Sequence, residues 1–153
     1  MAKKVADQLV DTLEKAGVRR IYAVTGDSLN EVNEAVRKNG RLRWIHVRHE
    51  ETGAYAAAAE AQLTGELACC AGSSGPGHVH LINGLYDAQR SGARVLAIAS
   101  TIPSREFGTE YFQETNTIKL FDDCSYYNQV ATTPEQFPRM LQGAMQAAIS
   151  SCG

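Results

Sequence analysis

Short apolar runs alternate with longer segments of helical character along most of this 153-residue chain. The runs occupy residues 19–24, 42–47, 66–71 and 93–99, and a fifth follows a looser stretch, at 125–130. Near-continuous apolar strands separated by helices indicate a parallel sheet covered on both faces, because right-handed crossover connections place helices there. The pattern therefore predicts an α/β domain of three αβα layers, with a flavodoxin-like parallel sheet.

Apolar side chains at helical spacing, together with residues that favour helix ends, locate the intervening helices. Asp27 or Ser28 can cap the second helix, and Pro134 suits the start of the last one. A polar and aromatic loop with one short helix near its end is expected over residues 103–121. The longer helices are predicted over residues 3–16, 25–40, 50–63, 75–90 and from 134 onward.

Composition narrows the classes of partner. Fifteen Lys and Arg against seventeen Asp and Glu leave a formal net charge of -2, which predicts no nucleic-acid partner and no electrostatic attachment to a membrane. No stretch approaches the roughly 20 consecutive apolar residues that span a bilayer, and residues 1–10 lack the apolar core of a secretory signal, so a cytoplasmic location is expected. The four cysteines form no CxxC pair and are interpreted as reduced structural thiols.

In parallel α/β sheets, ligands bind beyond the carboxyl ends of the strands. The loops that follow the first four strands contain TGDS, RHEE, GSSGPG and STIPSREFGTEYFQE. The glycines of GSSGPG let the backbone approach a ligand, and the helix that follows offers unpaired N–H groups. The loop lacks the GK[ST] sequence of a phosphate-binding P-loop. Taken alone, a tight turn needed only for packing explains it at least as well.

Two interpretations of the charged RHEE sequence, residues 48–51, can be weighed from the residues alone: a metal site and a favourable helix start. Zinc proteases place a second His four positions after the first, and Gly53 stands there instead, so no metal ligand is predicted. Glu50 and Glu51 would both be favoured at the positive end of the following helix, by about 0.3–1 kcal/mol each. That effect accounts for an acidic residue at a helix start but assigns no chemistry to it.

Taken together, the four motifs TGDSLN, RHEE before an Ala-rich helix, GSSGPGHVHLINGLYDA and YFQET resemble the pyrimidine-binding domain of thiamine-diphosphate enzymes. Within that family the chain is most similar to the flavin-dependent pyruvate oxidases of bacteria, which pass electrons to quinone. The resemblance runs from about Val5 to Ser150. It implies that Glu50 hydrogen-bonds the aminopyrimidine ring of thiamine diphosphate and thereby promotes loss of the proton from thiazolium C2.

The resemblance also implies further contacts with the cofactor or the reaction centre. Thr25 and Gly26 take the place of a loop beside the pyrimidine, although many relatives have Pro-Gly-Gly where this chain has Thr-Gly-Asp. For His80, a role near the thiazolium and a purely structural one are weighed equally. Phe112 matches a residue that lies between thiamine and flavin in the family. The alternative is that its side chain only packs this loop against the sheet. The cofactor-binding residues implied are Thr25, Gly26, Glu50, Gly75, Pro76, His80, Phe112 and Gln113.

In the family, a separate domain holds the diphosphate and its Mg²⁺, and another binds FAD. This chain of residues 1–153 has neither, so it is expected to be a pyrimidine-binding domain that carries half of a site and is inactive alone. The substrate implied is pyruvate, and a homo-oligomer is expected. A C-terminal segment absent here would bring the full-length enzyme to the inner membrane. One more apolar strand should follow AISSCG and lie between the fourth and fifth strands, so an open sheet edge is expected beside VLAIA.

Two other functions remain open from the sequence. One is the pyrimidine-binding domain of an acetolactate-synthase-like carboligase of 2-keto acids, against which Thr25-Gly-Asp and His80 argue, because those enzymes have Asn in place of His80. The other is a non-catalytic oligomerisation module, against which the presence of Glu50 argues mildly. The loop over residues 104–117 is expected to be mobile without a partner domain.

Overall fold

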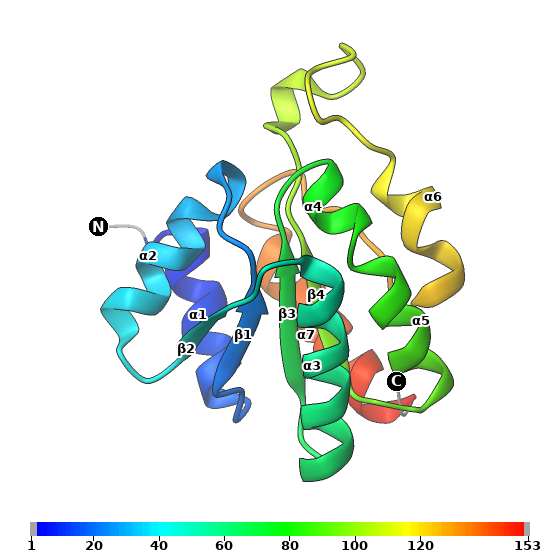
Figure 1. Ribbon diagram of the computed structural model, residues 1–153. Helices are drawn as coiled ribbons and strands as arrows, with labels where there is room; N and C mark the ends of the chain where they lie inside the picture. The colour runs from blue at the N-terminus through cyan, green and yellow to red at the C-terminus, as the bar shows by residue number, and fades with distance from the viewer. Residues whose placement is uncertain (1–2, 152–153) are drawn as a thin grey trace.

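A four-stranded parallel sheet forms the centre of the computed structural model, which describes residues 3–151 (Figure 1). Its strand order is β2-β1-β3-β4, and all three neighbouring pairs run parallel. The strands are β1 (Arg20–Ala23), β2 (Arg43–His46), β3 (Ala68–Gly72) and β4 (Val95–Ala99). β1, β2 and β4 lie within the apolar runs that predicted them, and β3 ends one residue beyond its run, at Gly72. The three-layer α/β fold expected from the sequence is confirmed.

Helices cover both faces of the sheet and create two separate hydrophobic clusters. One cluster joins α1, α2 and α7 to strand residues such as Ile21 and Cys69, and the other joins α3, α5 and α6 to residues such as Ala68 and Cys70. The helices are α1 (Val5–Lys15), α2 (Asn30–Asn39), α3 (Glu50–Thr64), α4 (Pro76–Val79), α5 (Ile82–Arg90), α6 (Thr117–Phe121) and α7 (Phe137–Ser150). Single 3-10 turns lie at Asp27–Leu29, Ser104–Glu106 and Asp122–Cys124.

Two adjacent cysteines in β3 contribute to the hydrophobic clusters on opposite faces of the sheet. Cys69 and Cys70 point to opposite faces of the sheet, as the period of two in a strand requires, and both are fully buried. They and Cys124 are free thiols. Burial raises the pKa of Cys70 to about 12 and that of Cys69 well above its ordinary value, which keeps both protonated. Cys152 lies outside the described residues.

The last helix begins at Phe137 and not at Pro134, because residues 134–136 form a turn. Two further predicted helix boundaries were wrong. Residues 75–90 form two helices, because a turn at His80 and Leu81 separates α4 from α5. The second helix begins later than expected, at Asn30, after the 3-10 turn, and no side chain caps it. Ser28, expected as a cap, instead accepts a hydrogen bond through Oγ from the backbone N–H of Ser74, at 2.9 Å. Both departures place side chains near the carboxyl edge of the sheet.

The predicted fifth strand, residues 125–130, was also wrong. This segment pairs with no strand among residues 3–151, and β4 is the edge of the sheet they form. Side-chain hydrogen bonds tie the segment to α6 instead: Ser125 Oγ donates to the Phe121 carbonyl at 2.7 Å, and Asn128 Nδ2 donates to the Ile118 carbonyl at 2.8 Å. The sequence does have strand character, but strand pairing needs a neighbour within about 5 Å.

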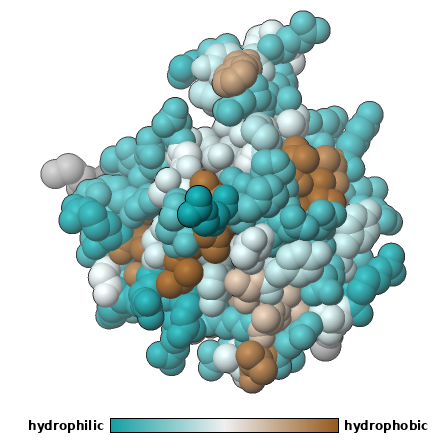
Figure 2. All heavy atoms as spheres, in the orientation of Figure 1, coloured by the Kyte–Doolittle hydropathy of each residue, from teal (hydrophilic) through white to brown (hydrophobic). Residues whose placement is uncertain are grey.

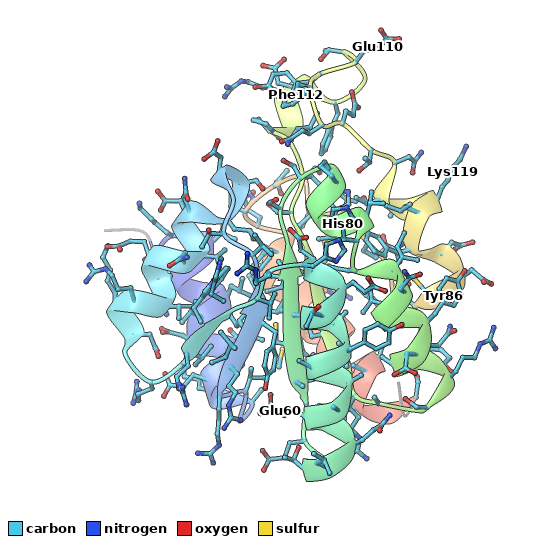
Figure 3. The ribbon with its side chains drawn as sticks, in the orientation of Figure 1. Glu60, His80, Tyr86, Glu110, Phe112 and Lys119 are labelled. Atoms are coloured by element: carbon cyan, nitrogen blue, oxygen red, sulfur yellow. The ribbon has the colours of Figure 1, made fainter. Side chains whose placement is uncertain are left out.

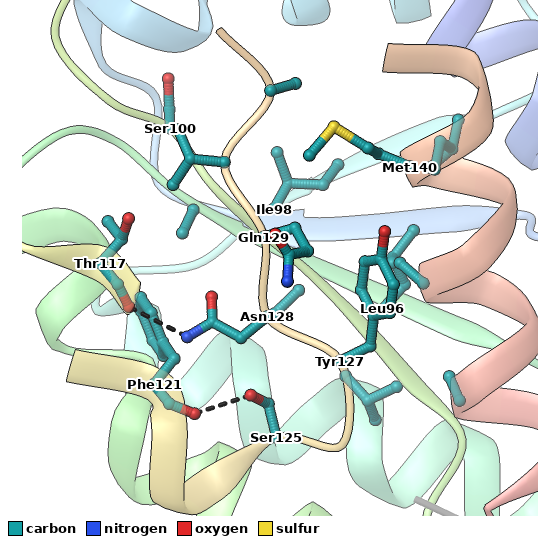
Figure 4. A pocket seen from close by; sticks show the side chains of 18 of the residues that line it. Leu96, Ile98, Ser100, Thr117, Phe121, Ser125, Tyr127, Asn128, Gln129 and Met140 are labelled. Carbon is teal, nitrogen blue, oxygen red and sulfur yellow. Dashed lines mark hydrogen bonds between the residues drawn. The ribbon is translucent and has the colours of Figure 1, made fainter. Parts of the chain in front are cut away.

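A cavity of about 490 Å³ lies where that neighbour would be (Figure 4). Leu96 and Ile98 of β4 line one side, Tyr127 and Gln129 of the unpaired segment line another, and Met140 of α7 contributes a third. The expectation of an open edge beside VLAIA agrees with this arrangement, because β4 and the extended segment are separated by this space. The cavity reaches Ser100 and Thr101 at the start of the fourth loop, but none of the predicted site residues lines it.

A segment running from about residue 103 to 116 projects from the carboxyl edge of the sheet (Figure 1). Nearly all of its residues are exposed, and Figure 2 shows it as a mostly hydrophilic extension at the top of the view. Its expected mobility stays a prediction. Within residues 3–151, none of the helices combines the length and the apolar character needed to cross a membrane.

Candidate functional site

The candidate site lies at the carboxyl edge of the sheet, where the loops after the four strands meet. Its central side chain is Glu50, the first residue of α3. His49 is the N-cap of this helix, and its Nδ1 accepts a long hydrogen bond, 3.3 Å, from the backbone N–H of Glu51. Glu51 in turn accepts a hydrogen bond from Asn83 at 3.0 Å. The two acidic residues at the helix start therefore occupy different surroundings.

Glu50 is buried although its side chain is acidic, with only 7% of the residue exposed. Its Oε2 accepts a hydrogen bond from Nδ1 of His80 at 3.0 Å, and the His80 side chain is 41% exposed. The ring of His49 stacks on that of His80, with centroids 4.3 Å apart and an angle of 27° between the planes. Figure 3 shows His80 between α4 and α5, above the start of α3. The break between α4 and α5 thus places this imidazole against Glu50.

The second carboxylate oxygen of Glu50 faces the glycine loop. A Cβ on Gly77 would lie 3.2 Å from Glu50 Oε1 and 2.4 Å from Ser73 Oγ, so only glycine allows this approach. No hydrogen bond to Oε1 is formed by the residues that the structure describes. One oxygen is therefore held by His80, and the other is left for a donor that approaches beside Gly77.

The loop after β1 packs directly on the glycine loop. A Cβ on Gly26 would lie 2.5 Å from Ser73 Cβ, so a larger residue would push the two loops apart. Ser28 joins three strand ends: its Oγ accepts from the N–H of Ser74, and its carbonyl accepts from Ser100 Oγ, both at 2.9 Å. These serines form hydrogen bonds between loops that are far apart in the sequence.

Buried His78 fixes the base of the projecting segment. Its Nδ1 lies 2.8 Å from the carbonyl of Ser100, and since a carbonyl only accepts, Nδ1 carries the proton. Nε2 then accepts from the hydroxyl of Thr115 at 2.5 Å. Burial lowers the pKa of His78, and the bond to Ser100 opposes that shift. A neutral His78 therefore links β4 to the returning end of the projection.

The structure brings most of the predicted site residues together and leaves others apart. Gly75, with a φ of 69°, sits under Gln113, whose Oε1 accepts from Ser74 Oγ at 3.0 Å. With Gly26, Glu50 and His80 they share the carboxyl edge of the sheet. Thr25 and Pro76 are exposed at this edge. Phe112 is 81% exposed and lies high on the projection, apart from His80 (Figure 3).

Sequence reasoning missed several side chains that shape this edge, namely Ser28, Ser73, Ser74, His78, Ser100 and Thr115. The GPGHVH sequence contained a signal for His78, since a His on a helix that faces its own sheet is expected to be buried. The hydrogen bonds of the serine side chains had no local signal, because each joins residues at least 39 positions apart.

These groups suit a flat, polar heterocycle. Glu50 Oε1 can accept a hydrogen bond from a protonated ring nitrogen. Gly26 and Gly77 let the loops after β1 and β3 pack closely around Ser73, next to this carboxylate. An open parallel sheet with a buried carboxylate and a glycine loop at its carboxyl edge is characteristic of a cofactor-binding α/β domain.

Comparison with known proteins defines the class further. Residues 3–120 match the family model described as thiamine pyrophosphate enzyme, N-terminal TPP binding domain. The chain belongs to this family, and the donor set described above fits the cofactor in its name.

Three relatives show the range of proteins it resembles. It is 57% identical, over 98% of its length, to an uncharacterized 42.6 kDa protein from Pseudomonas amyloderamosa. It is 38% identical, over 95%, to pyruvate oxidase from Lactiplantibacillus plantarum, and 33% identical, over 97%, to acetolactate synthase 3 from Brassica napus. It spans only 38%, 24% and 23% of these relatives, respectively. The family is therefore shown, and the reaction of the whole protein is a separate question.

Proposed function

We propose that this domain supplies the pyrimidine-binding half of a thiamine-diphosphate- and flavin-dependent pyruvate oxidase, in which Glu50 activates the cofactor. The reaction would be the oxidative decarboxylation of pyruvate to acetate, with electrons passed to quinone. The observation that carries the proposal is the buried Glu50 carboxylate, with Oε2 held by His80 and Oε1 free beside Gly77.

Glu50 is suited to one task in this arrangement, which is to hold a proton at a ring nitrogen. The hydrogen bond from His80 fixes the orientation of the carboxylate, so that Oε1 is presented beside the glycine loop. Thiamine diphosphate, when bound, supplies an acidic carbon and stabilises the negative charge left after decarboxylation. Glu50 acts on that chemistry through the pyrimidine ring, and it does not act as a base on pyruvate.

Other groups follow from the same proposal and lie outside this chain. Mg²⁺ and the diphosphate would be held by a second domain, and FAD by a third, which agrees with relatives roughly three to four times as long as the region they share with this chain. Since half of the cofactor site would come from another subunit, a homo-oligomer is proposed. Isolated residues 1–153 should not turn over pyruvate.

Sequence identity favours pyruvate oxidase over a carboligase. Identity to the Lactiplantibacillus enzyme is 38%, against 33% for the Brassica synthase. The alternatives are an acetolactate-synthase-like enzyme and a non-catalytic oligomerisation module. The placement of Glu50 argues against the module, because a carboxylate held by His80 with Oε1 unpaired among the described residues offers an acceptor that an oligomerisation module does not need.

Product analysis distinguishes these three functions. A longer protein that carries this domain together with the proposed flavin-binding and diphosphate-binding domains would be incubated with pyruvate, thiamine diphosphate, Mg²⁺, FAD and a quinone. Acetate formed together with reduced quinone is expected. Acetolactate as the main product would assign the carboligase, and unchanged pyruvate in a folded, cofactor-loaded protein would assign the module.

A further inference from the structure

Three potential metal ligands meet at the start of α3. His49 and Glu50 are adjacent in sequence, and His80 arrives from the turn between α4 and α5. One ligand atom from each of them lies within 4.8 Å of the other two. The expectation of no metal rested on the spacing within RHEE, and that spacing carries no information about a histidine 30 residues further along.

The side chains of His49, Glu50 and His80 favour a particular class of metal ion. Two imidazoles with one carboxylate suit Zn²⁺ and similar divalent transition metals, and catalytic zinc sites often have three such protein ligands with a fourth position open. Mg²⁺ prefers oxygen ligands and retains its waters, so these residues would not hold it. The cluster is therefore distinct in chemistry from a magnesium-diphosphate site.

The present distances come close to those of a metal site. His80 Nδ1 and Glu50 Oε2 are 3.0 Å apart, and two donors about 2 Å from a tetrahedral ion lie about 3.3 Å from each other. An ion would thus replace the shared proton with little movement. Glu51 adds negative charge nearby, with its Oε2 3.7 Å from Nδ1 of His49.

The His49 side chain must rotate before it can coordinate an ion together with Glu50 and His80. Its ring stacks on that of His80, and stacked rings do not direct their nitrogen lone pairs at one point. The movement is feasible because the side chain is 47% exposed and its hydrogen bond with the Glu51 N–H is long, at 3.3 Å. Rotation of this one exposed side chain completes a three-ligand set.

We propose that His49, Glu50 and His80 form a binding site for a divalent transition-metal ion of the zinc type, with its fourth position open to solvent. The site follows from this geometry alone. A consequence rests on the proposed function: an ion bound to Glu50 occupies the carboxylate that would serve the pyrimidine ring. Zinc would then inhibit the enzyme by competing for Glu50.

The site is tested with tag-free residues 1–153 and Zn²⁺ in calorimetry, with Co²⁺ absorption as a report on coordination. Saturable one-to-one binding is expected. His49→Asn keeps a helix cap, His80→Gln keeps an amide donor to Glu50, and each should weaken binding by at least about tenfold. His46→Ala, an exposed histidine on β2, is the matched control and should bind as the wild type does.

Circular dichroism would verify that each variant is folded. Equal zinc affinity in the wild type and in folded His49→Asn and His80→Gln would overturn the site, as would the lack of a saturable phase.

The competition is measured separately, in the longer protein. Zn²⁺ should inhibit turnover, and a chelator should restore it. Zinc binding without inhibition of an enzyme that depends on Glu50 would overturn the competition alone. Full turnover by Glu50→Gln would instead refute the proposed function while leaving the metal site intact.

Discussion

At the scale of single residues, Glu50 differs from Glu51 in what each carboxylate contacts. Glu51 is part of the helix surface and accepts from Asn83, whereas Glu50 is buried, accepts from His80 and directs its other oxygen toward Gly77. The general preference of acidic residues for helix starts applies to both. Only the tertiary position of Glu50 suits it to the proposed role, and the sequence singled out that residue through its motif.

His78 should make stability sensitive to acid. Burial lowers the pKa of His78 below the ordinary value of 6.5. Just below that pH, the imidazole is therefore protonated in the unfolded chain but stays neutral in the folded chain. The stability it contributes is thus present above about pH 6.5 and is lost as the pH falls toward the folded-state pKa. His78→Gln should reduce the loss of unfolding free energy between about pH 7.5 and 5.5, by up to about 1.4 kcal/mol per pH unit.

Urea denaturation at several pH values measures this effect. His46→Gln changes an exposed histidine and should keep the wild-type dependence on pH. If His78→Gln and wild type lose stability in parallel, then His78 is not the group whose protonation the fold resists.

At the scale of elements, the sequence predicted those strands and helices that depend only on the local pattern of residues. The four paired strands coincide with apolar runs to within one residue, and α3 ends within one residue of its predicted end, at Thr64. Residues 125–130 have the same local pattern as a strand, but pairing depends on a neighbour, and a cavity lies between them and β4. The contacts of Ser28 and His78 likewise join separate loops, so no local pattern could predict them.

Close packing of α3 against α5 depends on Gly84. A Cβ at this position would lie 2.5 Å from Ala54 Cβ and 2.8 Å from the backbone nitrogen of Tyr55. Because a backbone atom cannot move aside cheaply, Gly84→Ala should lower the free energy of unfolding by about 1–3 kcal/mol. The exposed Asp87→Ala on the same helix should change it by no more than about 0.5 kcal/mol. Equal stability of the two variants in urea would show that the helices separate without strain.

At the scale of the whole molecule, this chain corresponds to about a quarter of the pyruvate oxidase that it resembles. If the diphosphate is held by another domain, residues 1–153 provide only the pyrimidine contacts and lose the charged contacts to phosphate. Calorimetry of residues 1–153 with thiamine diphosphate and Mg²⁺ should therefore show weak binding at most. Submicromolar affinity would mean that the half-site proposal is wrong.

The central claim is that Glu50 promotes loss of the proton from thiazolium C2. Exchange of that proton for deuterium can be followed by NMR after acid quench, in the longer protein with bound thiamine diphosphate and Mg²⁺. Glu50→Gln should slow the exchange by about 10²–10⁴-fold, while Glu51→Gln should leave it at the wild-type rate. Exchange in Glu50→Gln as fast as in the wild type, with the cofactor equally bound, would contradict the role assigned to Glu50.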